Sequence, residues 1–251
     1  MLELNKVSRH FGGVKAVDEL DLTVHQGEIL GLIGPNGSGK STTVNLITGV
    51  YRHQSGSMHF KGQDIAPLDP HERTAIGIAR TFQNIRLFGH LTVWQNLWAA
   101  RVVRRGGWSG FRERWLSGAV AAREQAEELL EFGNLADKRD MLAGNLAFGE
   151  QRRLELVRAA ASGAELLLLD EPAAGMNAEE IGDLDERIRK LRDQGRTILL
   201  IEHHMELVME VCDRVVVLNF GRKIAEGTPA QVQADAQVRA AYLGADESAV
   251  S

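Results

Sequence analysis

The 251-residue chain has a single cysteine, few aromatic residues and no long hydrophobic run. Because Cys212 has no second cysteine to pair with, a disulfide within the chain is excluded. Apolar stretches such as 166–169 and 198–201 are far shorter than the roughly 18 residues that a membrane helix requires. The N-terminal segment from Met1 to Lys6 also lacks the basic start and apolar stretch of a signal peptide. These absences favour a cytosolic protein whose contact with a membrane comes through a partner.

The chain also lacks an excess of positive charge. It carries 29 Lys and Arg against 34 Asp and Glu, which gives a formal net charge of −5. No overall basic field is present to attract nucleic acid, so a nucleic-acid partner is disfavoured. The hydrophobic fraction of 44% is typical of a globular chain, and the length suffices for one core with an inserted subdomain.

A glycine-rich segment gives the strongest positive signal. Its residues are Gly34, Pro35, Asn36, Gly37, Ser38, Gly39, Lys40, Ser41 and Thr42. The spacing Gly-x4-Gly-Lys-Ser, after an apolar run and before a predicted helix over 42–48, matches the phosphate-binding P-loop. Its glycines let backbone N–H groups point at phosphates, Lys40 is placed to bridge the β- and γ-phosphates, and Ser41 offers a hydroxyl to Mg²⁺. The segment predicts binding of a nucleoside triphosphate.

Two carboxylates follow a second apolar run. Asp170 and Glu171 come directly after four leucines, so we expect them at the carboxyl edge of a buried strand, where ligands bind in α/β sheets. Asp170 is placed to hold Mg²⁺ and Glu171 to orient the attacking water. The alternative is that both carboxylates only cap the following helix. A guanine-reading Asn-Lys-x-Asp is not supported, because Asn5-Lys6-Val7-Ser8 precedes the P-loop and ends differently.

The order of segments predicts an α/β fold with a mainly parallel sheet. Short antiparallel strands are expected over the first thirty residues, and helices over 94–103 and 119–132. After residue 150 helix and strand alternate: helices over 151–161 and 178–193, strands over 166–170, 197–202 and 214–218. We divide the chain into a core with an antiparallel β subdomain (1–82 and 154–233), a helical insertion (83–153) and a loosely held C-terminal tail (234–251).

With these motifs, the chain resembles the ATP-binding subunits of ABC transporters over nearly its whole length. The resemblance implies the P-loop NTPase fold of RecA-like type, with ATP and Mg²⁺ bound. It also implies that Phe11 packs against adenine, Gln83 senses Mg²⁺, and His203 contacts the γ-phosphate. Each of these residues has a plain structural alternative: a turn or core Phe, a surface Gln, and a His satisfied within the fold.

The segment from Leu146 to Gln151 resembles the signature loop of the family but departs from its common form, Leu-Ser-Gly-Gly-Gln. Ala147 lacks the usual hydroxyl and Glu150 brings a negative charge, while Gly149 and the start of the next helix remain. In the family this loop binds the γ-phosphate held by the opposite subunit, so the resemblance implies a weaker or rebalanced contact across a dimer. Asn177 stands where Asp is common in the family, which also affects communication between the two subunits of the dimer.

These departures resemble one branch of the family, the ATPases of branched-chain amino-acid importers, and the longer of their two ATP subunits. The segments that carry this resemblance are Asn145 to Glu155, Glu171 to Asn177, Ile201 to Met205 and Ala241 to Gly244. Urea and amide importers and lipopolysaccharide exporters share much of the pattern. Less favoured alternatives are a soluble ABC ATPase acting on ribosomes or DNA, and an unrelated P-loop kinase.

The resemblance implies that other subunits complete the transporter. They are transmembrane permease subunits, a second ABC ATP-binding subunit in a homo- or heterodimer, and indirectly a solute-binding protein, with this chain at the cytoplasmic face of the membrane. Trp94 and Trp98 are expected to pack the helical insertion, with an interface for a membrane-subunit helix as the alternative, and Phe88 is the better candidate for that groove. Trp108 and Trp115 lie in or beside the same insertion. The arginines at 104–105 and 112–114 indicate a solvated face, with contact to membrane headgroups as the alternative.

Overall fold

The computed structural model describes residues 1–102 and 118–247. The strands are β1 (Leu2–Phe11), β2 (Val14–Val24), β3 (Ile29–Ile33), β4 (Ser55–Phe60), β5 (Gln63–Asp64), β6 (Ile78–Arg80), β7 (Leu166–Asp170), β8 (Thr197–Ile201), β9 (Arg214–Asn219) and β10 (Arg222–Gly227). The helices are α1 (Lys40–Ile47), α2 (Pro70–Ile76), α3 (Val93–Val102), α5 (Gly118–Phe132), α6 (Phe148–Ala161), α7 (Ala178–Asp193), α8 (Met205–Val211), α9 (Pro229–Ala234) and α10 (Ala236–Glu247). None of the helices in the described ranges has the length and apolarity needed to cross a bilayer.

Two sheets form the framework. The larger has the order β10-β9-β3-β8-β7-β6 and is parallel except for β10, and the smaller has the antiparallel order β2-β1-β4-β5. This arrangement confirms the predicted mainly parallel sheet with an antiparallel subdomain. The two N-terminal strands are longer than expected, at 10 and 11 residues, because β1 continues through irregular register shifts where the sequence suggested turns.

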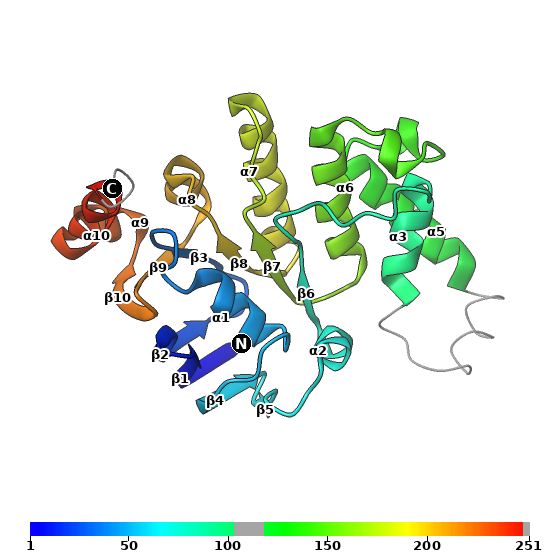
Figure 1. Cartoon of the computed structure of the whole chain (residues 1–251). Coiled ribbons are helices and arrows are strands. Elements are labelled where there is room, and N and C mark those ends of the chain that lie inside the picture. Colours follow the sequence, from blue (N-terminus) through cyan, green and yellow to red (C-terminus); the bar gives the residue numbers. More distant parts are fainter. Residues whose placement is uncertain (103–117, 248–251) are drawn as a thin grey trace.

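The large sheet is buried on both faces, and alternate residues of each strand separate two cores. On β9, Val215 and Val217 face a core that also contains residues of α7 and α8, whereas Val216 and Leu218 face a core built with α1 and the small sheet. Because side chains alternate along a strand, the continuous apolar runs read in the sequence supply both layers at once. Figure 1 shows α7 and α8 above the sheet and the antiparallel strands below it.

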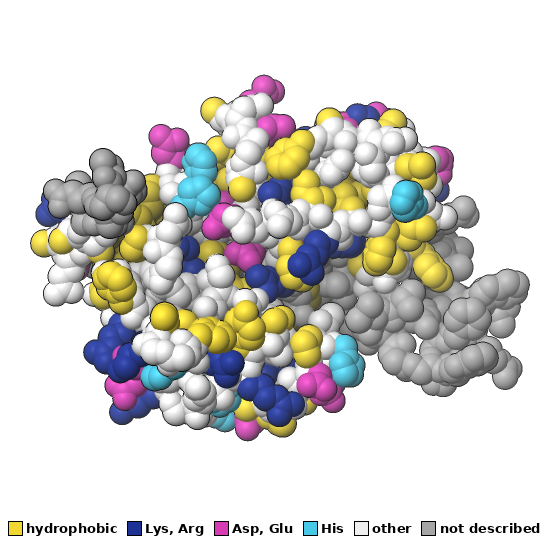
Figure 2. All heavy atoms as spheres, in the orientation of Figure 1, with side chains coloured by type: hydrophobic (Ala, Val, Ile, Leu, Met, Phe, Trp, Pro, Cys, Tyr) yellow, Lys and Arg dark blue, Asp and Glu magenta, His cyan; other side chains and the backbone are white. Residues whose placement is uncertain are grey.

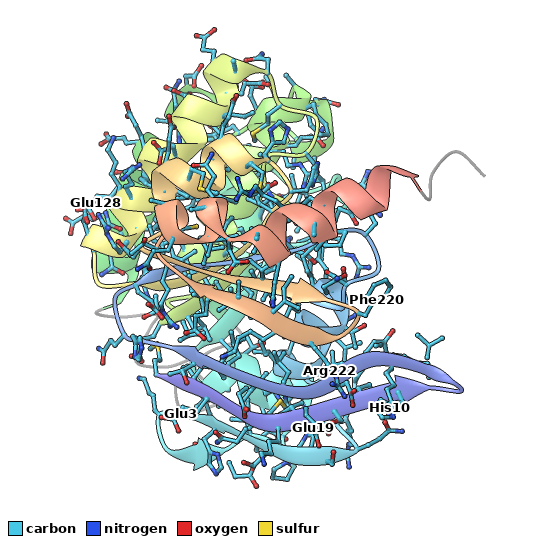
Figure 3. All side chains as sticks on the ribbon, turned by 90° about the vertical axis from the view of Figure 1, so that its left-hand side faces the viewer. Glu3, His10, Glu19, Glu128, Phe220 and Arg222 are labelled. Carbon is cyan, nitrogen blue, oxygen red and sulfur yellow. The ribbon has the colours of Figure 1, made fainter. Side chains whose placement is uncertain are left out.

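A buried carboxylate ties the two sheets together at one edge. Arg222, which extends from β10 towards the antiparallel strands (Figure 3), donates to the Asp18 carboxylate at 2.8 Å. Lys15 lies 3.2 Å from the same carboxylate, whose side chain is 8% exposed. The Arg222 hydrogen bond is the chief cause that holds the pKa of Asp18 below its ordinary value.

The predicted helical insertion has its own apolar cluster. Val93 and Leu97 of α3, Leu130 of α5, and Leu154 and Val157 of α6 pack together. Helix α6 also contributes to the core against the large sheet, so one helix joins the insertion to the sheet. Residues of α6 therefore belong to both apolar clusters.

The expectation of a loosely held C-terminal tail is wrong for the described residues. The chain forms α9 and α10, Val238 is buried, and Tyr242 packs against the same core as α7 and α8. These two residues are four positions apart and therefore share one face of α10. The many small and polar residues around them hid that short apolar face.

Candidate functional site

The glycine-rich loop connects β3 to α1, and its shape requires glycine at two places. Gly34 and Gly39 have φ values of 147° and 108°. A Cβ on Gly34 would lie 2.1 Å from the Leu218 carbonyl oxygen, and one on Gly39 would lie 2.4 Å from the Ala16 carbonyl oxygen. The backbone therefore curls tightly against β9 and β2, which leaves its amide groups at the start of α1.

Lys40 begins α1 and is buried. Its ammonium donates to the carbonyl oxygens of Gly34 at 2.7 Å and Pro35 at 3.0 Å, so the side chain folds back over the loop. Burial lowers the pKa of Lys40, and the nearby charges of Glu171 and Asp170 oppose that fall. A cation is thus held inside the loop and close to both carboxylates.

The remaining loop residues differ in accessibility. Asn36 and Gly37 form an exposed tip, Ser41 is exposed, and Thr42 is half-buried in the first turn of α1. The Ser38 hydroxyl is buried and has no hydrogen-bond partner. An unpaired buried polar atom in a glycine-rich loop of this kind is a group that a bound phosphate can satisfy.

The acidic pair lies where the sequence places it, at the end of β7. Asp170 is the last strand residue, and Glu171 follows with φ 48°, a left-handed conformation unusual outside glycine. The Gln83 side-chain amide donates to the Glu171 carboxylate at 2.8 Å, and the His203 Nδ1 atom lies 3.8 Å from it. Gln83, the pair of Asp170 and Glu171, and His203 come from three separate segments and meet at one sheet edge.

Two further residues of this edge escaped the sequence analysis. Glu202 is fully buried at the end of β8 and accepts hydrogen bonds from the backbone N–H groups of Ala173, His203 and His204. Arg80, the last residue of β6, donates to the Asp170 carboxylate at 2.6 Å. The only sequence signal for either was a charged residue at the end of an apolar run. Figure 2 shows carboxylate and histidine side chains gathered between α8 and β7, with Lys and Arg side chains beside them.

The donor set of this edge fits Mg²⁺ rather than a softer metal. The described residues contain no cluster of three or more His, Cys, Asp or Glu that could hold a metal ion by itself. Mg²⁺ is usually held by one or two carboxylates together with hydroxyls, water and substrate phosphates. Asp170 and Ser41 supply such oxygens beside a phosphate loop, so a site completed by the nucleotide is chemically reasonable.

Phe11 lies at the end of β1 with its side chain 39% exposed. Its ring meets Tyr51 edge-to-face at 5.2 Å between centroids, and the Arg9 guanidinium lies 4.7 Å from the Phe11 ring centre. An aromatic side chain anchored on two sides but left partly open offers a surface on which a base can stack.

The signature loop opens α6 with its charges paired. Ala147 is the N-cap residue, and its N–H donates to the Glu150 carboxylate at 3.0 Å. Glu150 also contacts Lys138 and lies 3.8 Å from Arg153. The hydrogen bond from Lys138 is the main reason that the pKa of Glu150 is below its ordinary value. The expected unfavourable charge at this loop is therefore largely neutralised within the chain.

Gly149 and Asn177, the other two positions noted in the sequence, both contact Glu180 of α7. Gly149 is close-packed, since a Cβ there would lie 2.3 Å from the Glu180 carboxylate of α7. Asn177 is the N-cap of α7, where its side chain accepts from the Glu180 N–H at 3.0 Å. In Figure 1, β6 and β7 separate α6 from the glycine-rich loop at α1, so the signature loop does not close over its own P-loop.

The aromatic residues of the insertion divide into two groups. Trp94 packs against the apolar cluster of the insertion, as expected, with the Arg139 guanidinium 4.9 Å from its ring. Trp98, expected to pack there as well, does not: it is 58% exposed and lies outside that cluster. Phe88 is 54% exposed. Trp108, Trp115 and the two arginine groups lie outside the described residues.

A glycine-shaped loop with a buried lysine, facing two carboxylates at the end of the neighbouring strand, defines a P-loop nucleotide-binding ATPase. A family model described as "ABC transporter" matches residues 17–174, and one described as "Branched-chain amino acid ATP-binding cassette transporter" matches residues 222–248. The chain belongs to the ATP-binding domain family of ABC transporters, and it is an ATP-hydrolysing cassette.

Known proteins match along nearly the whole chain. The high-affinity branched-chain amino acid transport ATP-binding protein LivG of Escherichia coli K12 is 41% identical over 249 residues, 97% of this chain and 98% of LivG. BraF of Pseudomonas aeruginosa, described in the same words, is 40% identical with the same coverage. The lipopolysaccharide export system ATP-binding protein LptB of Haemophilus influenzae is 36% identical, with 97% of each chain covered.

Solved structures agree with the fold. The ADP conformation of MJ1267, an ATP-binding cassette of an ABC transporter, has a TM-score of 0.85 and 32% identity, and the match covers 97% of this chain and 98% of that one. A dimeric post-hydrolysis state of the cassette MJ0796, bound to ADP and Pi, has a TM-score of 0.77 and 26% identity, over 91% and 99% of the chains. The predicted fold class and family are confirmed.

Proposed function

We propose that this chain is the ATP-hydrolysing subunit of an ABC importer for branched-chain amino acids. The observation that carries the proposal is the convergence of Lys40, Gln83, Asp170, Glu171 and His203 at one sheet edge. The names of LivG and BraF, and the family model matched over α10, support the choice of solute. The solute itself does not touch this chain, because binding and permeation belong to other subunits.

The nucleotide lies across three elements. Phe11 stacks against adenine, the loop from Gly34 to Thr42 surrounds the phosphates with its amides, and Lys40 leaves the loop carbonyls to bridge the β- and γ-phosphates. Ser41, Asp170 and Gln83 would hold Mg²⁺ at this site. The metal supplies charge neutralisation of the phosphates, while the protein side chains fix its position.

Glu171 orients the attacking water and His203 steadies the γ-phosphate. Both side chains belong to loops that the buried Glu202 carboxylate ties together through three backbone N–H groups, which supports a fixed relation between them. Before nucleotide binds, the Gln83 side-chain amide donates a hydrogen bond to the Glu171 carboxylate. Because Gln83 contacts Glu171 and would also help to hold Mg²⁺, the metal site and the residue that orients the water share one side chain.

Two cassettes form the working unit, each closing its signature loop over the partner's P-loop. The separation of α6 from α1 within one chain and the capped first turn of α6 support this arrangement, with Ala147, Gly149 and Glu150 facing the γ-phosphate of the opposite subunit. Size-exclusion chromatography of the Glu171→Gln protein tests it. ATP with Mg²⁺ should convert the chain to a dimer, alone or with the second ATP-binding subunit. A monomer under both conditions would refute the sandwich.

The membrane subunits dock on the groove between the core and the insertion. Its lining includes Val50, Arg80, Phe82, Ala100, Glu155 and Arg158. The Arg158 guanidinium lies 5.8 Å from the exposed Phe88 ring, which places Phe88 at the rim. An aromatic rim around a mixed lining suits a helix from a partner, because interface cores are enriched in aromatic side chains and Arg. Docking there puts the chain at the cytoplasmic face of the membrane.

Phe88→Asp tests this docking. The variant should bind ATP normally but fail to couple hydrolysis to transport, because a charge replaces the apolar contact while the P-loop is untouched. The measurement is uptake in vesicles that contain permease and solute-binding protein, beside ATP binding by the isolated chain. Trp98→Asp is the matched control for an exposed aromatic on the same insertion. Retained transport in Phe88→Asp would exclude Phe88 from the groove.

The solute is tested with the same vesicles. An importer of branched-chain amino acids accumulates leucine, isoleucine or valine in an ATP-dependent manner, and a solute-binding protein is required. The rival function, lipopolysaccharide export, finds support in the similarity to LptB. Uptake of urea or amides in place of these amino acids, or ATP turnover stimulated only by an exporter permease, would overturn the proposed solute.

A further inference from the structure

Arg80 joins three elements of the nucleotide site. From the end of β6, one guanidinium nitrogen donates to the Asp170 carboxylate at 2.6 Å, and another donates to the Asn45 side-chain oxygen at 2.6 Å. Asn45 belongs to α1, the helix that the P-loop opens, and Asp170 ends β7. The Arg80 and Asp170 side chains are 12% and 7% exposed. A single side chain therefore connects the phosphate-loop helix to the acidic strand.

The charge on Asp170 needs a partner at this depth. An ionised carboxylate withdrawn from water is costly unless a cation or several hydrogen bonds compensate it. Lys40, the other cation of the site, donates to the loop carbonyls, and Glu171 adds a second negative charge beside Asp170. Arg80 supplies the compensating charge by direct contact.

We propose that Arg80 is the built-in counter-cation of Asp170 in the metal-free protein, and that Mg²⁺ displaces it when nucleotide binds. This inference rests on the proposed role of Asp170 in holding Mg²⁺. Arg80 keeps the carboxylate oriented and paired in the metal-free protein, and its contact with Asn45 retains the guanidinium once Asp170 turns to the metal. Because Arg80 competes with Mg²⁺ for one carboxylate, it sets how much Mg²⁺ the site requires.

The geometry explains why the residue is arginine. A planar guanidinium offers several N–H groups in a fixed fork, so it can reach acceptors on two different elements, whereas a lysine ammonium is a single point charge. Arg80 also lines the groove between the core and the insertion, which gives the released guanidinium space beside its original position. Lysine at this position should therefore retain the charge but weaken the link to Asn45.

Thermal unfolding of the full chain, with ADP to avoid turnover, tests the proposal. In metal-free buffer Arg80→Met should lower the midpoint by at least about 5 °C, because it leaves a buried carboxylate unpaired. The double variant Arg80→Met/Asp170→Asn should be more stable than Arg80→Met, since the unpaired charge is gone. When Mg²⁺ is titrated at saturating ADP, the unfolding midpoint rises with the Mg²⁺ concentration. The Mg²⁺ concentration that gives half of this rise, the Mg²⁺ half-point, should be several-fold lower for Arg80→Met than for wild type. Arg80→Lys should fall between wild type and Arg80→Met.

Arg187→Met is the matched control. The Arg187 side chain is also 12% exposed and pairs with a carboxylate, Asp183, but it lies on α7 away from the phosphate loop. This variant should lose stability without a change in the Mg²⁺ half-point. An unchanged half-point in Arg80→Met, or a double variant no more stable than Arg80→Met, would overturn the proposal. A Mg²⁺ response that survives in Asp170→Asn would instead refute the proposed metal role of Asp170.

Discussion

The first turn of α6 depends on one carboxylate, and Glu150→Ala should destabilise the chain measurably. Glu150 accepts from the Ala147 N–H at 3.0 Å, contacts Lys138 and lies 3.8 Å from Arg153, with its side chain 15% exposed. Loss of a capping hydrogen bond at a helix N-terminus costs about 0.5–2 kcal/mol, and a partly buried ion pair contributes up to about 1 kcal/mol. Together they give about 2 kcal/mol, or a fall of about 4–8 °C in the unfolding midpoint of a chain of this size.

The pH dependence of this loss has a defined sign. Lys138, the Ala147 amide and Arg153 hold the pKa of Glu150 below the ordinary value of 4.5. The stabilisation is therefore fully present above pH 4.5 and disappears as pH falls through the lowered pKa of the folded protein. The difference in midpoint between wild type and Glu150→Ala should stay constant from neutral pH to about pH 5 and narrow below 4.5.

Circular dichroism or fluorescence during heating measures both effects. Glu186→Ala is the control, because Glu186 is also a helical glutamate near a lysine, but its side chain is 72% exposed and lies 3.7 Å from Lys190. That variant should change the midpoint little at any pH. Two results would refute the pairing of Glu150 at the signature loop. One is an equal unfolding midpoint for Glu150→Ala and Glu186→Ala, and the other is a difference between wild type and Glu150→Ala that does not narrow at acid pH.

Two other changes give opposite results. Ala147→Ser should raise the unfolding midpoint by about 2–4 °C, because Ala147 has the extended backbone of an N-cap and a hydroxyl there gains about 1 kcal/mol from the free N–H groups of α6; a lower midpoint would show that the loop cannot take the side chain. Val238→Ala should lower the midpoint by about 3 °C or more, because Val238 lies on the buried face of α10 and is 4% exposed. An unchanged midpoint would show that the C-terminal segment is loosely held after all.

The sequence was most informative where the chain follows local rules. The glycine spacing before Lys40, and the leucines before Asp170, each need only their own neighbours to form, so their place at the sheet edge was predictable. The helices predicted over 94–103 and 178–193 form as α3 and α7, with the first starting one residue earlier. The predicted fold class depended on such local patterns.

What the sequence could not supply depends on distant partners. Arg80 and Asp170 are 90 positions apart, and nothing local to either indicates their contact. The same holds for Glu202, whose three N–H donors lie on two loops, and for Glu150, whose negative charge is paired with Lys138, 12 positions away. Charge balance inside a site is decided by the tertiary arrangement, and the separation in sequence hides it.

The central claim is that Glu171 and the P-loop form one hydrolytic site. ATP turnover and retained nucleotide, measured together on wild type and Glu171→Gln, test it most directly. Removal of a residue that orients or activates the attacking water costs about a hundredfold or more in rate. We predict that turnover falls by at least about that factor while ATP remains bound, because Lys40 and the loop amides are unchanged. Turnover near the wild-type rate in Glu171→Gln would contradict the account.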